Sequence, residues 1–506
     1  MGTKMGNGSA ARLCLLVSIV VAFPALATEE SELKLQRIMQ RMEKLEKRND
    51  ELEKAMHTRG TGANSQIEER LKELENYNTR LDSALSTEEV SDKEPELATR
   101  LKAVEYQTLD IQKQAKVIDS IEGFSAAANF TSVAQHASGI NDSGTQLNYR
   151  TDITVTTPKV KTGDTESKVF SHFRVGQGKG LSDKFTSFVG PNATSFQLGS
   201  VVEPESSAMM LAQVWYQADI PMPFGGFKPH SRETLTVNFG KMDPFAFFDQ
   251  NAAANDENRQ FLASTFVHNA LLDNPLAANI GADGFGFTPG FRVSYYNWST
   301  KPETYRLSLG LFGAGRSANF SDSFKSPFVI LQAETSQRFF TGLLGNYRIY
   351  LWSNGQAPTF AKGETAVHSG VGFNFDQRID DGITLFGRLG TGSGDRLPFD
   401  RTASLGAEFN GSYWSRGADA IGLAGGYNRT SEDFRNQSAT LDANADGIPD
   451  YGFAAMGWEQ LMEIYYRYRV HKGFELTGDF QYINNPAGNT DALPVKIVGV
   501  RANLAF

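Results

Sequence analysis

Two stretches near the C-terminus, residues 462–470 and 473–484, alternate between polar and apolar side chains. Their charged positions are Glu463, Arg467, Arg469, Glu475 and Asp479. Successive side chains of a β-strand point to opposite faces, so each stretch has one charged face and one apolar, aromatic face. Arginines and carboxylates on a water-facing surface can hold a polar solute weakly and reversibly. The pattern fits a half-buried soluble sheet and also a barrel whose apolar side faces lipid.

Polar positions of the same kind recur in other alternating segments, and they are candidates for the lining of a pore. They are Arg292, Arg306, Arg348, Arg388, Glu408 and Arg501, and Trp215 and Trp352 fall on the same predicted face. A neutral polyol is recognised by paired hydrogen-bond donors and acceptors together with an apolar platform for its ring. The alternative is that these charges pair with one another for structural reasons, as in any water-filled barrel. An arginine ladder could also select anions.

Sequence motifs of enzymes are absent from the chain. It contains no HExxH, Walker A or GxSxG pattern. Its single cysteine, Cys14, lies in a segment that we expect to be removed, which excludes disulfides and thiol chemistry in the mature protein. The formal net charge of −9 argues against a nucleic-acid partner, because phosphate binding needs clustered lysine and arginine. We therefore predict a protein that is not an enzyme and that needs no cofactor.

A calcium-like motif stands within the 429–457 stretch. Asp442, Asn444, Asp446 and Asp450 have the spacing of ligand positions 1, 3, 5 and 9 of a calcium-binding loop. The glutamate expected at position 12 is absent, since Phe453 stands there. A structural calcium ion and an Asx-rich turn are both compatible with these residues.

The alternating pattern repeats from residue 121 onward, in segments of roughly ten residues separated by turn residues. Sixteen segments can be placed, near 121–135, 145–157, 167–177, 208–220, 231–243, 286–297, 302–313, 326–336, 343–352, 365–376, 383–390, 401–411, 418–428, 458–470, 473–484 and 494–506. An even number is typical of bacterial outer-membrane barrels, and 16 to 18 strands enclose an aqueous channel. The predicted fold is an all-β transmembrane barrel of about 16 antiparallel strands, preceded by an α-helical coiled-coil segment.

The links between these segments are unequal in length. The longer links, near 178–207, 244–285 and 429–457, all fall at one end of the barrel when the strands are counted alternately. The links 377–382 and 471–473 fall at the other end and are short. Outer-membrane barrels show this asymmetry. The alternative, a soluble β-sandwich, would not need it.

The N-terminal part of the chain divides into two predicted segments. Residues 1–27 read as a secretory signal, with an early basic region, a short apolar run and an Ala-Leu-Ala cleavage site. Residues 28–120 read as a coiled-coil stalk, because apolar residues recur at spacings of three and four. Asn49 and Asn78 occupy buried seam positions that would fix register and oligomeric state. An amphipathic helix folded back on its own chain is the alternative. The barrel domain is then 121–506.

Two stretches resemble the carbohydrate-selective porin family of the OprB type. They are KMDPFAFFDQNAAANDENRQFLASTFVHNALLDN (241–274) and DFQYINNPAGN (479–489), and the resemblance extends over roughly 121–506. The final strand, which ends in Phe506, is similar to the signal read by the outer-membrane assembly machinery. The resemblance implies a 16-stranded barrel that passes small sugars by diffusion. The expected setting is a homotrimer in the bacterial outer membrane, in contact with its lipid, with the stalk in the periplasm and touching the cell wall.

The 244–285 link is the longest of the predicted links. Its length and the resemblance suggest that it folds inward and narrows the pore. The residues expected near the constriction are Phe248, Asn251, Asp256, Glu257 and Arg259. An outer cap that packs on neighbouring loops is the alternative.

Two other functions stay open at this point. A strongly positive lumen would favour a channel that exports an anionic polysaccharide. A stalk that binds the cell wall would favour an envelope tether with an incidental pore. A hydrolase is disfavoured, because no nucleophile and base are visible as a pair.

Overall fold

The computed structural model describes most of the chain after residue 123. The described residues are 124–506 except 141–143, 182–183, 197–206, 223–230, 279, 281–285, 340–341 and 362. They belong to the second of two units into which the chain divides, 1–94 and 95–506. The predicted signal segment (1–27) and stalk (28–120) lie outside the described residues.

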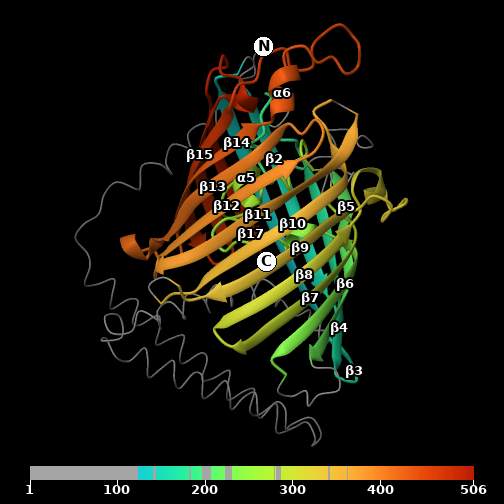
Figure 1. Cartoon of the computed structure of the whole chain (residues 1–506). Helices are drawn as coiled ribbons and strands as arrows, with labels where there is room; N and C mark the ends of the chain where they lie inside the picture. The colour runs from blue at the N-terminus through green and yellow to red at the C-terminus, as the bar shows by residue number, and fades with distance from the viewer. Residues whose placement is uncertain are drawn as a thin grey trace, which may run out of the picture. The chain divides into compact units, whose positions relative to one another are not determined.

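The described residues form a closed antiparallel barrel of sixteen strands, which confirms the predicted barrel (Figure 1). Its strands are β1 (Ser125–Ser138), β2 (Thr145–Thr156), β4 (Thr165–Gln177), β5 (Ala208–Met222), β6 (Glu233–Met242), β7 (Thr288–Thr300), β8 (Glu303–Phe312), β9 (Phe328–Gln337), β10 (Gly345–Pro358), β11 (Thr365–Asp380), β12 (Ile383–Ser393), β13 (Phe399–Asn410), β14 (Ala420–Thr430), β15 (Trp458–His471), β16 (Phe474–Asn484) and β17 (Val495–Ala505). Each of the sixteen predicted segments overlaps one of them. The register between β1 and β17 closes the sheet and runs from Asn129 opposite Ala505 to Ser138 opposite Lys496.

A seventeenth strand, β3 (Val160–Thr162), was not expected from the sequence. It pairs with β4 as a short hairpin that lengthens the link after β2. Short helices occur in the other links, namely η2 (Pro244–Ala246), α5 (Ser264–Val267), η3 (Gly315–Asn319), η4 (Gly411–Trp414), α6 (Glu432–Gln437) and η5 (Pro486–Gly488). None of the helices in the described part of the chain is long and apolar enough to span a membrane.

The two ends of the barrel differ as the link lengths predict. The long links β4–β5, β6–β7 and β14–β15 share the end that carries α6, whereas β3 lies at the opposite end (Figure 1). At that opposite end β11 and β12 are joined by two residues, and so are β15 and β16. We call these the long-link end and the short-turn end.

The barrel wall is apolar outside and polar inside. Leu307 and Leu309 are about half exposed on the outer face, at 51% and 50%, whereas Ser308 between them is 1% exposed. Ile349 and Leu351 of β10 are likewise exposed, and Arg348 and Tyr350 are buried. This inverts the arrangement of a soluble protein and is what a barrel surrounded by lipid requires.

Two of the long links fold into the barrel and fill much of its interior. We call them the first inner segment (residues 184–196) and the second inner segment (residues 243–278). They are bonded to each other, because the Ser264 amide donates to the Gly190 carbonyl at 2.8 Å and the Ala193 amide donates to the Leu262 carbonyl at 2.7 Å. Helix α5 belongs to the second inner segment and is seen within the ring of strands (Figure 1).

Candidate functional site

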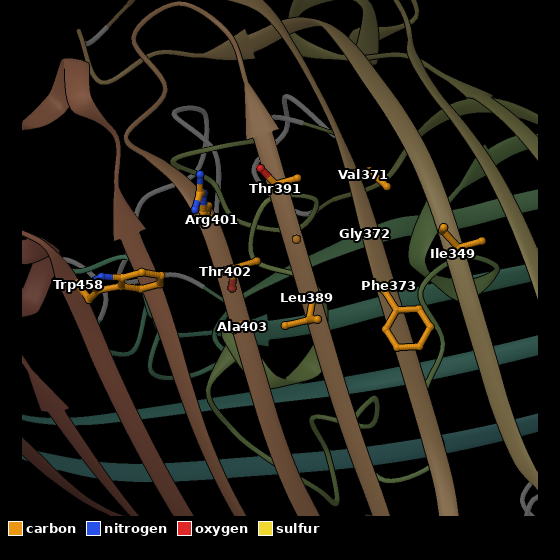
Figure 2. Close-up of a pocket in the computed structure, with 11 residues that line it drawn as sticks. Ile349, Val371, Gly372, Phe373, Leu389, Thr391, Arg401, Thr402, Ala403 and Trp458 are labelled. Carbon is orange, nitrogen blue, oxygen red and sulfur yellow. The ribbon is translucent and has the colours of Figure 1, made fainter. Parts of the chain in front are cut away.

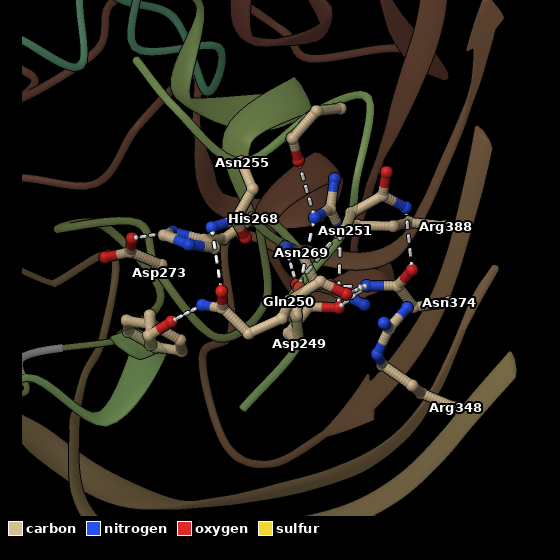
Figure 3. Close-up of polar contacts among 12 residues, drawn as sticks. Asp249, Gln250, Asn251, Asn255, His268, Asn269, Asp273, Arg348, Asn374 and Arg388 are labelled. Carbon is tan, nitrogen blue, oxygen red and sulfur yellow. Dashed lines mark hydrogen bonds and ion pairs between the residues drawn. The ribbon is translucent and has the colours of Figure 1, made fainter. Parts of the chain in front are cut away.

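Asp249 is the centre of the contacts that fix the second inner segment to the barrel wall (Figure 3). Its carboxylate forms an ion pair with Arg388 of β12 at 3.1 Å and accepts hydrogen bonds from the Asn374 side chain and the Asn269 amide. Asp249 and Arg388 are 0% and 1% exposed, so the pair is fully desolvated. The Arg388 guanidinium also donates to the carbonyls of Phe266 and Ala254. One arginine therefore ties three points of the inner segment to the wall.

Strands β15 and β16 provide a second anchor for the same segment. The Glu463 carboxylate accepts hydrogen bonds from the amides of Leu262 and Ala263 at 2.6 and 3.0 Å. Arg259 binds Glu475 through two nitrogens, at 2.8 and 2.5 Å. Charge-assisted and bidentate bonds of this kind are stronger than neutral ones and fix orientation. The segment is thus held across the barrel.

The remaining contacts of the second inner segment reach the strands at the barrel closure. Arg501 of β17 donates to the Glu257 carbonyl at 2.8 Å, and Arg150 of β2 pairs with the Glu257 carboxylate at 2.7 Å. Asn258 accepts a hydrogen bond from the Thr131 hydroxyl of β1. The wall formed by β11–β17, β1 and β2 is therefore largely covered, and we call it the covered wall.

The first inner segment packs against part of the covered wall. Glu459 of β15 accepts hydrogen bonds from the Ser187 hydroxyl and the Phe188 amide at 2.6 and 2.9 Å. Gln135 and Gln481 both donate to the carbonyl of Pro191. These contacts leave few polar groups of β15 and β16 for a solute.

Several predicted lining residues lie inside the barrel but are buried by protein groups. Glu463, Arg467, Glu475, Asp479 and Arg501 are 0–5% exposed. They were expected to face water, and the two inner segments cover them instead. Arg348 is also buried and forms an ion pair with Asp376 at 2.8 Å. Glu408 and Arg469 remain partly exposed, at 16% and 12% of their side chains.

The wall formed by β4–β8 is different, and we call it the open wall. Its inward polar groups bond mostly to one another rather than to the inner segments. Thr236 donates to Asp219 at 2.7 Å, Asn238 donates to Gln217 at 3.1 Å, and Ser308 donates to Ser294 at 2.9 Å. Arg306 keeps 34% of its side chain exposed, and its nearest described carboxylate, Glu334, is 4.0 Å away.

Arginines stack on aromatic rings along this open wall. Arg292 lies over Phe247 at 4.9 Å, and Arg306 lies over Tyr296 at 4.6 Å. Arg174 lies over Phe287 at 5.0 Å. Each pair combines hydrogen-bond donors with a flat apolar surface, and cation–π attraction holds the two together. Phe247 belongs to the second inner segment, so the segment contributes one ring to this wall.

The two predicted tryptophans are packed inside the protein rather than presented to a solute. Trp215 is 8% exposed, stacks on Phe170 at 4.7 Å and meets the edge of Phe247 at 5.5 Å. Trp352 is 5% exposed within the same apolar cluster. Trp215 therefore packs against Phe247 and helps to hold its ring in place.

The predicted constriction residues lie in the second inner segment and have two roles. Phe248 and Asn251 are buried, and Asn251 donates to the Asn374 side chain at 2.9 Å. Arg259 is 7% exposed and bonded to the wall. Asp256 and Glu257 stay partly exposed. Asp256 and Glu257 are thus the predicted constriction residues that keep contact with solvent, although the Glu257 carboxylate is paired with Arg150.

The calcium-like motif forms a turn held by its own backbone. The Asp442 carboxylate accepts hydrogen bonds from the amides of Asp446 and Gly447, and Asp450 accepts from the Ala443 amide. Asn444 donates to Asp446 at 2.9 Å. In the part of the chain that the structure describes, no three His, Cys, Asp or Glu side chains gather to hold a metal ion. These bonds favour the Asx-rich turn.

Two titratable groups sit where the second inner segment leaves β6. Burial raises the pKa of the Asp243 carboxyl to about 6, although the charge of His268 opposes this. Burial alone would lower the pKa of His268, but the hydrogen bond and charge of Asp273 outweigh it and raise that pKa above its ordinary value. The start of the segment is therefore sensitive to mildly acidic pH.

Several residues of this site were not expected from the sequence. Arg174, Phe287 and Tyr296 were not singled out, and neither were Arg150 and Asp152. Arg174 stands two residues after His172, and both side chains bond Asp152, so the regular alternation of β4 already placed Arg174 on the inner face. Arg150 lies in a polar strand in which periodicity gives little contrast.

Comparisons with known proteins agree with the barrel fold. The chain is 25% identical to porin AaxA of Chlamydia pneumoniae over 162 residues, which are 32% of this chain and 33% of that relative. The match thus spans about a third of the relative's length. The high-pH structure of Pseudomonas putida OprB superimposes with a TM-score of 0.59 at 16% identity, over 76% of this chain and 94% of that one.

The family model described as "Carbohydrate-selective porin, OprB family" matches residues 172–506. This range holds the thirteen strands β5 to β17, the second half of β4 and both inner segments. The match covers more than half of the chain, and it includes every arginine of the open wall. The chain therefore belongs to the OprB family of carbohydrate-selective porins.

Proposed function

We propose that this protein is an outer-membrane channel through which small sugars diffuse passively along the open wall. The observation that carries the proposal is the stacking of Arg306, whose side chain is 34% exposed, on Tyr296 of the open wall. Arg174 and Arg292 stack on Phe287 and Phe247 along the same wall. Family membership supports the substrate class.

The chemistry of this wall suits a neutral polyol better than an ion. A sugar ring can lie against an aromatic face while its hydroxyls exchange water for arginine donors and carboxylate acceptors. Asp152, Asp219 and Glu334 lie among the arginines and offset much of their charge. Many weak contacts along a path let a solute enter and leave quickly, as conduction requires.

The setting of the channel follows from the same proposal. The long-link end would face the outside and the short-turn end the periplasm, as in other outer-membrane barrels. The segment 28–120 would form a periplasmic stalk, and the chain would assemble as a homotrimer through its seam residues. The signal in residues 1–27 would direct export of the chain before it assembles.

One residue, Arg292, supports a second candidate function. The Arg292 guanidinium is buried, donates to Asn238 and Ser308, and forms no ion pair within the described residues. A buried arginine with only neutral partners is a place where an anion could bind. An anionic polysaccharide or uronate channel is therefore the second candidate.

Single-channel conductance in a planar bilayer separates these functions. Saturable block by small neutral sugars, weakened in the Arg306→Gln variant, is the expected result. The matched control is Arg316→Gln, an exposed arginine of η3 outside the barrel wall. Block by uronates alone would favour the anion channel. A folded barrel without conductance would contradict both channel functions and would leave the envelope tether as the remaining candidate.

A further inference from the structure

The outer face of the barrel carries an apolar groove over β10–β15 (Figure 2). Its volume is about 330 Å³, at the lower end of the range of about 300–1,000 Å³ for sites that hold small ligands. The side chains that shape it are Ile349, Val371, Phe373, Leu389, Ala403 and Trp458. This groove lies on the outer face of the wall, away from the lumen described above.

The strand register explains why the wall is hollowed at this point. Leu389 stands opposite Phe373 on one side and opposite Ala403 on the other, and Ala403 stands opposite Tyr427. Ala403 thus places a single methyl group between larger side chains in one row. In Figure 2, Phe373 and Trp458 stand on either side, with Leu389 and Ala403 between them.

A positive charge stands at one end of the groove. Arg401 is exposed in the next row toward the long-link end, opposite Thr391 on β12 and Arg429 on β14. Arg429 is neutralised by Asp400, to which its Nε donates at 2.9 Å. Arg401 has no hydrogen bond or ion pair to any residue that the structure describes. Figure 2 shows Arg401 and Thr391 together at that end.

We propose that this groove binds an anionic, phosphate-bearing membrane lipid. An acyl chain would lie over Leu389 and Ala403, and the phosphate would be held by the Arg401 guanidinium with the Thr391 hydroxyl beside it. The planar fork of arginine matches a phosphate better than a lysine would. Trp458 stands in the row of Arg401, at the level where aromatic side chains favour the lipid head-group region.

A lipid fits these observations better than a second copy of the chain does. A stable interface between proteins covers about 800 Å² on each partner, whereas this feature is one narrow groove with a cation at its end. An unneutralised arginine would also be costly to bury against a copy that offers no carboxylate. The proposal requires that the barrel lie in a membrane, but it does not depend on passage of sugars.

Native mass spectrometry of the full chain in neutral detergent tests the proposal. The probes are phosphatidylglycerol, diacylglycerol with the same chains, and inorganic phosphate alone. Phosphatidylglycerol is expected to remain bound to the parent protein, and Arg401→Gln is expected to weaken it about tenfold, as for loss of one charge-assisted contact. Ala403→Leu, which fills the groove, is expected to weaken both lipids. Arg316→Gln is the control and is expected to change nothing.

Three outcomes would overturn the proposal. Equal retention of phosphatidylglycerol by the parent and by Arg401→Gln would remove the role of the arginine. Binding of inorganic phosphate as tight as that of the lipid would remove the role of the groove. Loss of oligomers in both variants without any change in lipid retention would assign the face to a second copy. Arg401 is exposed, so this variant is expected to fold even if Ala403→Leu does not.

Discussion

The covered wall and the open wall are built on the same pattern, with a polar residue at every second position. Their inward side chains nevertheless have different contacts. On the covered wall, Arg388 and Glu463 bind backbone groups of the second inner segment. On the open wall, Arg292 and Arg306 lie over aromatic rings and bond mainly to neighbours in the wall. The comparison shows that an inward charge becomes a structural anchor where a segment folds across it, and we propose that it contacts solute where none does.

The largest expected effect comes from breaking the anchor of the covered wall. Arg388→Ala leaves Asp249 buried without a cation, which is expected to cost about 3–5 kcal/mol of stability. The second inner segment should then detach, and single-channel conductance should rise while sugar block weakens. Urea unfolding in vesicles and planar-bilayer recording measure the two effects.

A matched control uses an exposed ion pair. Glu364→Gln breaks the pair with Arg396, whose side chain is 41% exposed, and is expected to change stability by less than about 1 kcal/mol. If Arg388→Ala were as mild as this control, the inner segment would not depend on its anchor.

The next largest effect is expected on the open wall. Phe247→Ala removes the ring beneath Arg292 while leaving the Asp249 anchor two residues away intact. Because a stacked ring contributes about 0.5–2 kcal/mol, the dissociation constant for a blocking sugar should rise roughly 2- to 30-fold. Titration of sugar block measures this constant. Unchanged block with changed stability would assign Phe247 to packing alone.

A smaller effect is expected from Arg469→Gln on the covered wall. Its Nε lies 3.5 Å from Glu475, which Arg259 already binds through two nitrogens. The inner segment should stay in place, and the sugar dissociation constant should change by less than about threefold. The same titration of sugar block as for Phe247→Ala measures this constant. A rise in the constant as large as in Phe247→Ala would contradict the proposed difference between the two walls.

The last prediction concerns stability rather than sugar binding, and it is a dependence on pH at the start of the inner segment. The pKa of Asp243 is raised to about 6 in the folded state. The stability that it contributes is therefore complete below the unfolded pKa, near 4, and is lost as pH rises through about 6. Asp243→Asn keeps the side-chain oxygen that accepts from the Phe245 amide and should remove this slope between pH 4 and 6. Thermal melts across this range measure it.

The sequence predicts the barrel well because the period of two is a property of each strand by itself. Leu307 and Leu309 bracket Ser308 whether or not anything is known of the rest of the chain. The lengths of the links also predict that the two ends of the barrel differ. The three-residue strand β3 is too short to show a period.

The division into two walls could not be predicted in the same way. Glu463 and Arg306 both occupy polar positions of alternating segments. They differ because Leu262 and Ala263, which stand 201 and 200 positions before Glu463, donate hydrogen bonds to it. The turn at Asp249, which has a positive φ of 54°, sets the path of that segment. Contacts over such separations depend on three-dimensional placement that local periodicity does not encode.

The most direct test of the two-wall account is thiol modification during current recording. The chain has one cysteine, Cys14, so a Cys14→Ser background isolates introduced thiols. Thr236→Cys places a thiol on the open wall, and Thr477→Cys places one on the covered wall, where Thr477 is 2% exposed. We predict that a water-soluble thiol reagent lowers the current through Thr236→Cys, that sugar slows this reaction, and that Thr477→Cys does not react. Reaction at Thr477→Cys with none at Thr236→Cys would contradict the account.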